Sequence, residues 1–357
     1  MLKKYIVLTA LLLLAGVSAV KAQPKGCSVY GVGFYNLENL FDTCHDAGKN
    51  DYEYLPDGRN KWDAQKYRHK LRNMARVLSE MGTDVLGDAG CAAIGVAEVE
   101  NDKCLTDLCN QEPLKARGFE FVHVEGPDQR GIDCALLYNP KLFRVRDVKL
   151  VPYVYKRPQD SLKATRGFLT VSGTLAGEHV AIVVCHLPSR AADSFFREEG
   201  GLQVKAVKDS LLRDDPQVKV LVMGDMNDDP HDRSMATCLQ GRRRVADVGT
   251  DDMYNPWWDE LATRTGTLLY DGAWNLFDQI LLSPSLIDKQ GTKNYSTLKL
   301  YGHEVFRRDY LFQQKGAYKG NTLRTIASGT WLDGYSDHLP TIVYLIKEQR
   351  NSKPKKR

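Results

Sequence analysis

The segment around Asp225 and Asn227 carries the most specific chemical signal in the chain. It reads V-M-G-D-M-N over residues 222–227, so an apolar run leads through a glycine into an alternating acid and amide. Residues two apart on a strand point to the same side, and Asp225 and Asn227 are therefore predicted to project together. A carboxylate can orient and deprotonate a water, and an amide can hold that water or a phosphoryl oxygen without adding charge. An Asn/Asp turn has the same composition, but the preceding apolar strand favours a functional loop on a rigid support.

Two further strand ends offer oxygen ligands for a hard cation. Asn36 and Glu38 follow the apolar run at 28–35, and Glu98 ends the run at 92–99. Period-two alternation places Asn36 and Glu38 on one face. Amide and carboxylate oxygens suit Mg²⁺ or Ca²⁺. Each segment alone could equally be a polar strand end or a solvated acid, so the prediction depends on their combination.

Histidines and acids at three other places could handle protons or bind phosphate. His186 ends an apolar run and could donate to a phosphate oxygen, and Arg190 follows it closely enough to bind phosphate in a fork geometry. Asp278 lies inside an apolar run, where a carboxylate is costly unless a partner such as a histidine satisfies it. Asp337 and His338 are adjacent and supply a metal ligand and a proton-handling group.

Strand-like and helix-like runs alternate along the chain without an internal repeat. Residues 62–81 show apolar positions at helical spacing and stop at Gly82. Consecutive strands between 119 and 186 lack crossover helices, which disfavours a doubly wound parallel sheet and favours an α/β domain with two packed sheets and outer helices. Strands are predicted at 28–35, 92–99, 119–124, 133–138, 143–151, 167–175, 179–186, 218–223, 276–282 and 341–346, and further helices at 106–117 and 194–213.

The N-terminus predicts export. Lys3 and Lys4 precede an apolar run at 5–14, and Val20 and Ala22 form a V-x-A cleavage pattern, so residues 1–22 are interpreted as a signal peptide of bacterial type. The run is too short to span a bilayer, and no later stretch is long and apolar enough. We therefore expect an exported protein without a transmembrane span, in the periplasm, at the cell surface or outside the cell.

The expected mature body carries little net charge. The formal charge is +4, and removing the three lysines of the signal peptide, which no acid offsets, leaves +1. Removing the four cations at 353–357, which belong to a basic tail at 349–357 that we expect to be disordered, leaves −3. This composition provides no global basic field for nucleic acid, although it does not exclude a local basic groove. The eight cysteines include no C-x2-C pair, so no zinc site is predicted.

Taken in order, these segments resemble the endonuclease/exonuclease/phosphatase superfamily, which includes pancreatic-type deoxyribonucleases, abasic-site endonucleases, inositol polyphosphate 5-phosphatases and bacterial sphingomyelinases. The most specific match is G-D-x-N at 224–227 followed much later by S-D-H at 336–338, and the resemblance runs from about Val32 to Ile346. It implies one domain over 23–348 with a four-layer α-β-β-α sandwich of two packed mixed sheets and outer helices.

The resemblance also implies roles for the individual residues. It makes Asn36, Glu98, Asp337 and the adjacent Glu38 the metal site, with Mg²⁺ as the expected ion and Mn²⁺ or Ca²⁺ as alternatives. It implies that Asp225 and Asn227 orient the attacking water, that Asp278 holds His338, and that His338 donates a proton or stabilises phosphate. His186 is similar to the second active-site histidine of the deoxyribonuclease branch, which a glutamate supports, and Glu125 is the candidate for that support.

The resemblance leaves the substrate open. A nuclease is the first expectation, with Arg130 and Arg190, joined by Arg166 and Arg197, as a phosphate track. A phosphatase or a sphingomyelinase-like enzyme is the alternative, although a lipid-active form would want an exposed aromatic loop, and we expect the Trp257–Trp258 pair to pack in the core. An inactive binding module is a minor alternative because every expected site residue is present. We expect a monomer.

Overall fold

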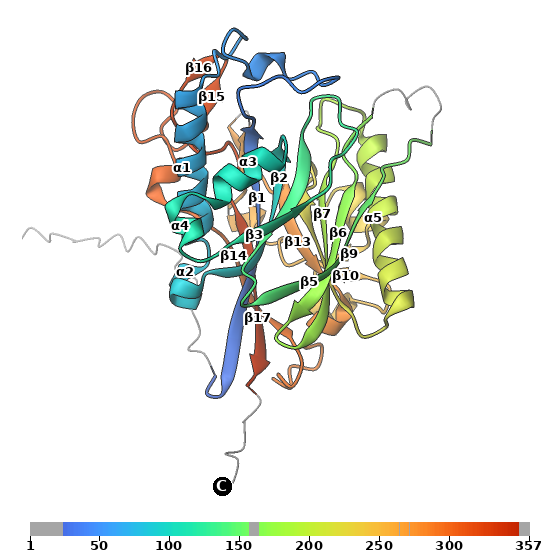
Figure 1. Ribbon diagram of the computed structural model, residues 1–357. Coiled ribbons are helices and arrows are strands. Elements are labelled where there is room, and N and C mark those ends of the chain that lie inside the picture. The colour runs from blue at the N-terminus through green and yellow to red at the C-terminus, as the bar shows by residue number, and fades with distance from the viewer. Residues whose placement is uncertain (1–23, 157–163, 264, 271, 350–357) are drawn as a thin grey trace, which may run out of the picture.

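Two large β-sheets packed face to face, with helices outside them, form the centre of the molecule in the computed structural model (Figure 1). The structure describes residues 24–349 except 157–163, 264 and 271. The predicted signal peptide and nearly all of the predicted basic tail therefore lie outside the described residues. The two-sheet α/β architecture expected from the sequence is confirmed.

The first sheet has six strands in the order β14-β17-β1-β2-β4-β3. Its first strand, β1, runs parallel to β2 and antiparallel to β17, so the two ends of the chain meet in the middle of the sheet. The strands span Cys27–Leu40 (β1), Cys91–Val99 (β2), Glu120–His123 (β3), Asp133–Tyr138 (β4), Lys299–Val305 (β14) and Thr341–Glu348 (β17).

The second sheet has seven strands in the order β5-β6-β7-β8-β13-β10-β9. Its central strands β7 and β8 are parallel, and β13 is antiparallel to β8 with Asp278 opposite Asp225. The strands span Phe143–Val151 (β5), Phe168–Leu175 (β6), Glu178–His186 (β7), Lys219–Asp225 (β8), Gly241–Arg242 (β9), Met253–Tyr254 (β10) and Asp278–Leu282 (β13). Two small hairpins, Leu268–Tyr270 (β11) with Ala273–Asn275 (β12) and Ile326–Ala327 (β15) with Thr330–Trp331 (β16), lie outside both sheets.

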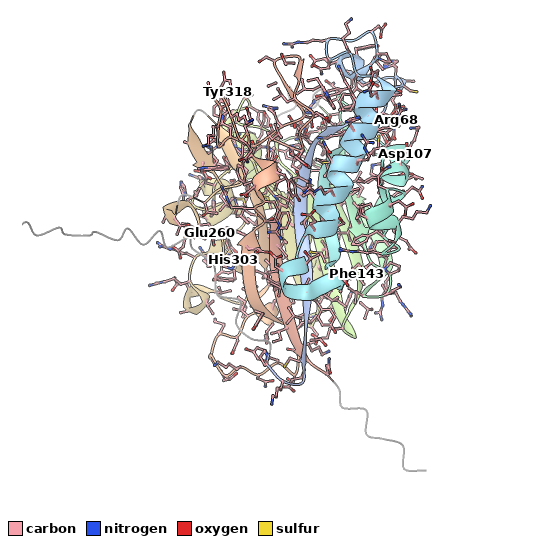
Figure 2. All side chains as sticks on the ribbon, turned by 90° about the vertical axis from the view of Figure 1, so that its left-hand side faces the viewer. Arg68, Asp107, Phe143, Glu260, His303 and Tyr318 are labelled. Atoms are coloured by element: carbon pink, nitrogen blue, oxygen red, sulfur yellow. The ribbon has the colours of Figure 1, made fainter. Side chains whose placement is uncertain are left out.

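Helices cover the outer faces of both sheets. The long helix α1 starts where Asp63 caps it by accepting from the backbone N–H groups of Gln65 and Lys66, and its buried face packs on the first sheet. Arg68 of α1 and Asp107 of α3 mark this outer helical layer in the side view (Figure 2). On the other side, α5 encloses a second apolar cluster against the second sheet. The helices span Ala64–Glu80 (α1), Thr83–Leu86 (α2), Asp102–Cys109 (α3), Glu112–Lys115 (α4) and Ser194–Asp214 (α5).

The two sheets approach each other closely below the ends of β2 and β8. A Cβ added at Gly95 would lie 2.6 Å from the Met223 sulfur, so a larger residue there would displace the Met223 side chain. Trp257 is fully buried and donates its indole N–H to the carbonyl of Ile280, as expected for a core residue, whereas Trp258, predicted to pack in the core with it, is only partly buried. No helix among the described residues has the length and apolar character needed to cross a bilayer.

One local prediction was wrong, and one strand of the first sheet was missed. Residues 106–117 do not form one helix, because Pro113 lacks the N–H needed to continue it, and the chain instead forms α3 and α4. Strand β14 was not predicted, because its half-buried sequence K-L-Y-G-H-E-V has no continuous apolar run. Its His303 pairs with Glu260 at 3.2 Å, which joins the edge of the first sheet to the 255–263 segment (Figure 2).

Candidate active site

Both sheets deliver polar side chains to one place at the ends of their central strands. Asn36 on β1 and Glu98 on β2 come from the first sheet, and His186 on β7 and Asp225 on β8 come from the second. The Asn36 amide joins the two sets, because its Nδ2 donates to Asp225 Oδ2 at 3.0 Å and approaches Glu98 Oε1 at 3.4 Å. The site therefore lies across the junction of the two sheets.

The backbone at these strand ends is left-handed. The φ angles of Glu38, Asn39, Glu98 and Asn227 lie between 49° and 62°. Non-glycine residues in this region cost about 1–3 kcal/mol each and persist where the surroundings hold them, often at functional sites. Here they end the strands and turn the backbone so that its N–H groups face the site; the Asn39 N–H donates to Glu98 Oε2 at 3.0 Å.

This turn also explains why Glu38 does not join Asn36. The pairing of β1 with β2 shifts register after Asn36, so the period-two alternation used for the prediction fails at this point. The Glu38 carboxylate instead accepts from Arg324 Nε at 2.7 Å and from the Thr325 N–H at 2.8 Å. The structure thus places Glu38 in an ion pair beside the cluster and leaves the Glu98 carboxylate facing Asp225 and His186.

Asp278 and His338 form a buried acid–imidazole pair. Their Oδ2 and Nδ1 atoms are 2.8 Å apart, and Asp278 is 0% exposed. Burial alone would lower the pKa of His338, but the carboxylates of Asp278 and Asp225 outweigh it and hold that pKa well above its ordinary value. His338 is therefore protonated at neutral pH, with Nε2 directed at Asp225 Oδ2 at 3.8 Å.

His186 has the opposite protonation state. Burial, followed by the positive charges of Arg166 and Arg130, lowers its pKa well below the ordinary value, so the ring is neutral. Its Nε2 lies 3.5 Å from Asp225 Oδ2, and its buried Nδ1 has no hydrogen-bond partner among the described residues. Glu125 does not support it, contrary to the expectation, because that side chain is exposed and pairs with Lys49 at 2.8 Å.

The segment after Asp225 is both an Asx turn and part of the polar cluster, the two possibilities that its sequence offered. Asp225 Oδ1 accepts from the Asn227 N–H at 3.0 Å, which is an Asx turn, while its Oδ2 faces the cluster. The Asn227 amide donates to the carbonyl of Leu187 at 2.9 Å. Burial raises the pKa of Asp225 to about 7, with the negative charge of Asp278 adding to the effect.

Asp337 and Arg130 lie at the rim. Asp337 pairs with Arg324 Nη2 at 3.0 Å, and its other oxygen is 3.9 Å from His338 Nε2. Arg130 is exposed and donates to the side chain of Asn39. Arg324 was missed by the sequence analysis, because no local pattern marks an arginine that meets Glu38 from 286 positions away.

Arg190 bonds to protein groups and is not free to bind phosphate. Its guanidinium reaches Asp229 and Asp232 at 3.0 and 2.7 Å, and its Nε donates to the Asn227 carbonyl. It also stacks over Phe277 at 4.4 Å. Arg190 thus fixes the turn that carries Asn227.

The donor set fits a divalent cation. Glu98, Asp225 and Asp278 are three carboxylates that form no ion pair with lysine or arginine among the described residues. Protonated His338 offsets part of their charge, and Lys70 acts on Glu98 without an ion pair. Ligand atoms of Asp225, Asp278 and His338 lie within 4.8 Å of one another. Asn36 presents its amide nitrogen to the carboxylates, and its oxygen accepts from the Glu38 N–H, so it would have to turn its amide to serve as an oxygen ligand.

Comparison with known proteins establishes the class of this chain. Residues 31–347 match the model of the Endonuclease/Exonuclease/phosphatase family, and the protein belongs to that family. Among curated proteins, none matches the chain in sequence.

Solved structures share the fold at low sequence identity. Truncated TDP2 from Caenorhabditis elegans has a TM-score of 0.53 and 14% identity, over 89% of this chain and 97% of that one. A family member from Bacteroides thetaiotaomicron has a TM-score of 0.52 and 16% identity over 90% and 98%. A mannosyl-6-phosphatase from the same organism has a TM-score of 0.52 and 16% identity over 88% and 99%. Membership of the family, established by the match over residues 31–347, makes the protein a phosphoesterase-type hydrolase.

Proposed function

We propose that the protein is an exported, divalent-metal-dependent phosphoesterase whose preferred substrate is a small phosphate ester. The observation that carries this proposal is the group of three carboxylates without lysine or arginine partners, two of them buried and Glu98 partly buried, flanked by a neutral His186 and a protonated His338. Hydrolysis of a phosphate ester needs positive charge against the phosphoryl oxygens, an anion to activate water and a donor for the leaving oxygen. This site offers groups for all three tasks.

The residues divide these tasks by their protonation states. Asp225 accepts the proton of the attacking water, and the Asx turn with Asn227 fixes the direction of its carboxylate. Protonated His338, held by Asp278, donates to a phosphoryl or leaving oxygen. Neutral His186 donates a hydrogen bond without adding charge. Glu98, with Asp337 at the rim and Asn36 after a turn of its amide, would hold Mg²⁺, which would supply positive charge against the phosphoryl oxygens when bound. Mn²⁺ or Ca²⁺ would suit the same oxygen donors.

The arginines favour a small ester over a polynucleotide. Arg166 pairs with Asp128 at 3.1 Å, Arg197 pairs with Asp228 at 2.8 Å, and Arg190 is engaged as described above. An extended phosphate track needs several uncommitted cations. The low net charge of the body supports the same choice.

Nucleic acid remains the second candidate, because exposed Arg130 lies at the rim and acts electrostatically on His186. The related TDP2 of D. rerio has been solved with a single-strand DNA product, and another relative is a mannosyl-6-phosphatase, so the fold hosts both substrate types. A sphingomyelinase-like role is less favoured, because Trp257 is buried and Trp258 is partly buried, so this pair does not form an exposed aromatic loop. The intact set of site residues argues against an inactive binding module.

Hydrolysis assays test this proposal. Purified protein with Mg²⁺ is offered phenyl phosphate, bis(4-nitrophenyl) phosphate, supercoiled plasmid and sphingomyelin vesicles, with and without EDTA. We expect metal-dependent release of phosphate from the monoester, and its loss in Asp225→Asn. Plasmid nicking at higher efficiency than monoester hydrolysis would reverse the order of the two candidates, and no hydrolysis of any ester by folded protein would reject the proposal.

Export has a separate test. If residues 1–22 are a signal peptide, mature protein recovered outside the cytoplasm begins at Gln23. Mass spectrometry of the N-terminus decides this, and a retained Met1 in the cell extract would contradict it.

A further inference from the structure

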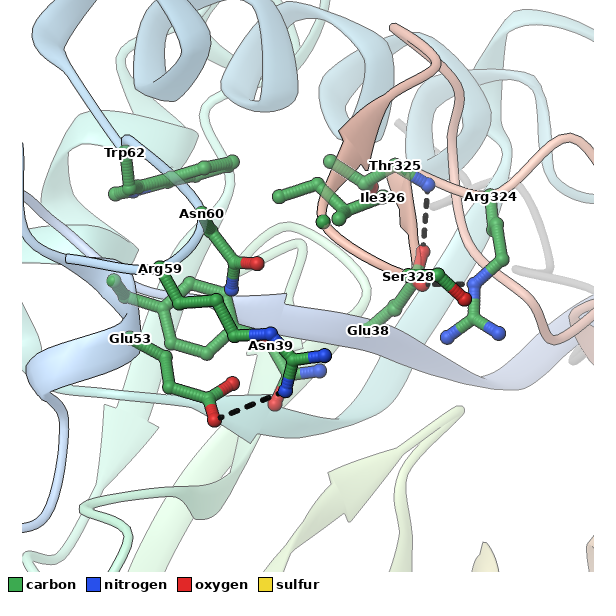
Figure 3. Close-up of a pocket in the computed structure, with 12 residues that line it drawn as sticks. Glu38, Asn39, Glu53, Arg59, Asn60, Trp62, Arg324, Thr325, Ile326 and Ser328 are labelled. Atoms are coloured by element: carbon green, nitrogen blue, oxygen red, sulfur yellow. Dashed lines mark hydrogen bonds and ion pairs between the residues drawn. The ribbon is translucent and has the colours of Figure 1, made fainter.

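A small pocket adjoins the carboxylate cluster (Figure 3). Its walls come from the end of β1, from residues 53–62 and from the turn at 324–329, and it holds about 160 Å³. Sites for drug-sized ligands hold about 300–1,000 Å³, so this pocket suits a single small group. Asn39 belongs to both places, because its side chain lines the pocket while its N–H donates to Glu98. An ester with its phosphate at the cluster would extend its organic part into this pocket.

The charged residues of the pocket neutralise one another. Arg59 pairs with Glu53 at 3.8 Å and Arg324 pairs with Glu38 at 2.7 Å, and both pairs are drawn in Figure 3. Two guanidinium groups are thus matched by two carboxylates. The pocket therefore has no excess positive charge for a second phosphate, and it favours a neutral group.

Polar groups without partners face this neutral space. Asn60 is only 6% exposed, and its side-chain amide has no hydrogen-bond partner among the described residues. Figure 3 shows that amide directed into the pocket, across from Ile326. The hydroxyl of Tyr54, another lining residue, also lacks a partner in the described chain. Because neither group bonds to a protein atom in the described chain, both are available to a ligand rich in hydroxyls.

The aromatic residues of the pocket do not offer a stacking platform. The Trp62 side chain is 0% exposed and donates its indole N–H to the Phe41 carbonyl. The Tyr54 ring stacks on Phe41 at 4.3 Å, and Trp62 packs against it edge-on. Recognition of nucleobases depends on open aromatic faces. The lining thus suits a polyhydroxylated ring better than a base.

We propose that this pocket binds the sugar of a monosaccharide phosphate, so that a sugar phosphate monoester is the substrate class of the site. This inference rests on the proposed phosphoesterase function. In the reaction, the oxygen of water bonds to phosphorus as the P–O bond to the sugar breaks. The sugar oxygen takes one proton, and the products are the free sugar and inorganic phosphate.

The test compares sugar and aryl esters in matched variants. We measure kcat/KM for glucose 6-phosphate, mannose 6-phosphate and phenyl phosphate in wild type, Tyr54→Phe, Asn60→Ala and the surface control Asn110→Ala. A hydroxyl-free phenylalanine keeps the ring contact with Phe41, so Tyr54→Phe stays informative if Asn60→Ala is unstable in thermal melting. We expect at least one hexose phosphate to exceed phenyl phosphate by tenfold or more. That ratio falls about three- to tenfold in each pocket variant, the range for one lost hydrogen bond, and not in Asn110→Ala.

Each outcome separates the pocket from the proposed function. Phenyl phosphate hydrolysis without preference for either sugar phosphate, or a preference that both pocket variants retain, would overturn the assignment and leave the phosphoesterase function intact. If no ester is hydrolysed, the phosphoesterase function is rejected, and calorimetric titration then tests whether the pocket binds a sugar phosphate. Mannose 6-phosphate or glucose 6-phosphate binding at least tenfold tighter than inorganic phosphate, and weakened in Asn60→Ala, would support it. Equal binding would reject it.

Discussion

Removing the charge of Asp278 is the sharpest test of the catalytic arrangement. The change Asp278→Asn keeps the size of a side chain that is 0% exposed and keeps a group able to hold the His338 ring, 2.8 Å away, but it removes the negative charge. The carboxylates of Asp278 and Asp225 hold the pKa of His338 well above its ordinary value, against the effect of burial. In the Asp278→Asn variant, one carboxylate fewer opposes the effect of burial, so the imidazole loses its proton at a lower pH.

The expected magnitude follows from the geometry. Two unit charges about 4 Å apart attract by about 4 kcal/mol at the effective dielectric constant near 20 that suits protein sites. Since each 1.36 kcal/mol is tenfold in rate, complete loss of this attraction in the transition state would cost about 10³-fold. The asparagine still orients the ring, so we expect kcat/KM to fall about 10²- to 10³-fold.

The assay is metal-dependent hydrolysis of phenyl phosphate between pH 5 and 9. The control is Asp215→Asn, which breaks the same kind of contact, from Asp215 Oδ2 to His179 Nδ1 at 2.6 Å, at the opposite ends of the strands. We expect the control to retain wild-type activity. Folded Asp278→Asn that melts near the wild-type temperature and keeps more than a third of wild-type kcat/KM across this range would refute this role of Asp278.

Four further changes test other parts of the structure. Glu98→Gln should raise the Mg²⁺ concentration for half-maximal activity at least about tenfold. Glu38→Gln should change that concentration less than threefold. Because Glu38 pairs with Arg324, Glu38→Gln should instead lower the free energy of unfolding by about 1–3 kcal/mol. Activity titrations and urea denaturation measure these effects, and equal metal dependence in the two variants would contradict the assignment. Phe143→Ala should cost about 3–5 kcal/mol of stability with activity per folded molecule unchanged, since Phe143 is fully buried on β5, far from the cluster. Burial raises the pKa of Glu304 above 4.5, so its contribution to stability is present in acid and is lost as the pH rises. The melting temperature of Glu304→Gln minus that of wild type should therefore rise from pH 4 to neutral, and a fall in this difference would contradict this sign.

The sequence could predict the two sheets and the strands that carry the site. Buried strands such as β7 and β8 have continuous apolar runs, and each ends at a residue of the cluster, His186 or Asp225. The sequence also predicts that Asp278, inside an apolar run, needs a partner, and in the structure that partner is His338. These features are local, or follow from the cost of burying a charge.

The remaining features depend on long-range geometry. Alternation predicts Glu38 beside Asn36, but a positive φ and a register shift turn Glu38 toward Arg324. The guanidinium of Arg190 suits phosphate, but in the structure it pairs with Asp229 and Asp232. The unpaired amide of Asn60 becomes visible only when the loop folds over the end of β1.

The position of β17 determines when a newly made chain can become an enzyme. This last strand pairs with β1 from Cys27↔Glu348 to Phe34↔Thr341, and His338 lies directly before it. Until the C-terminal segment has emerged, β1 lacks one of its two neighbours, and its open edge can pair with other chains. A chain that stops before residue 338 also lacks the imidazole opposite Asp278. Premature termination therefore yields an inert, aggregation-prone product, and hydrolytic activity is confined to completed molecules.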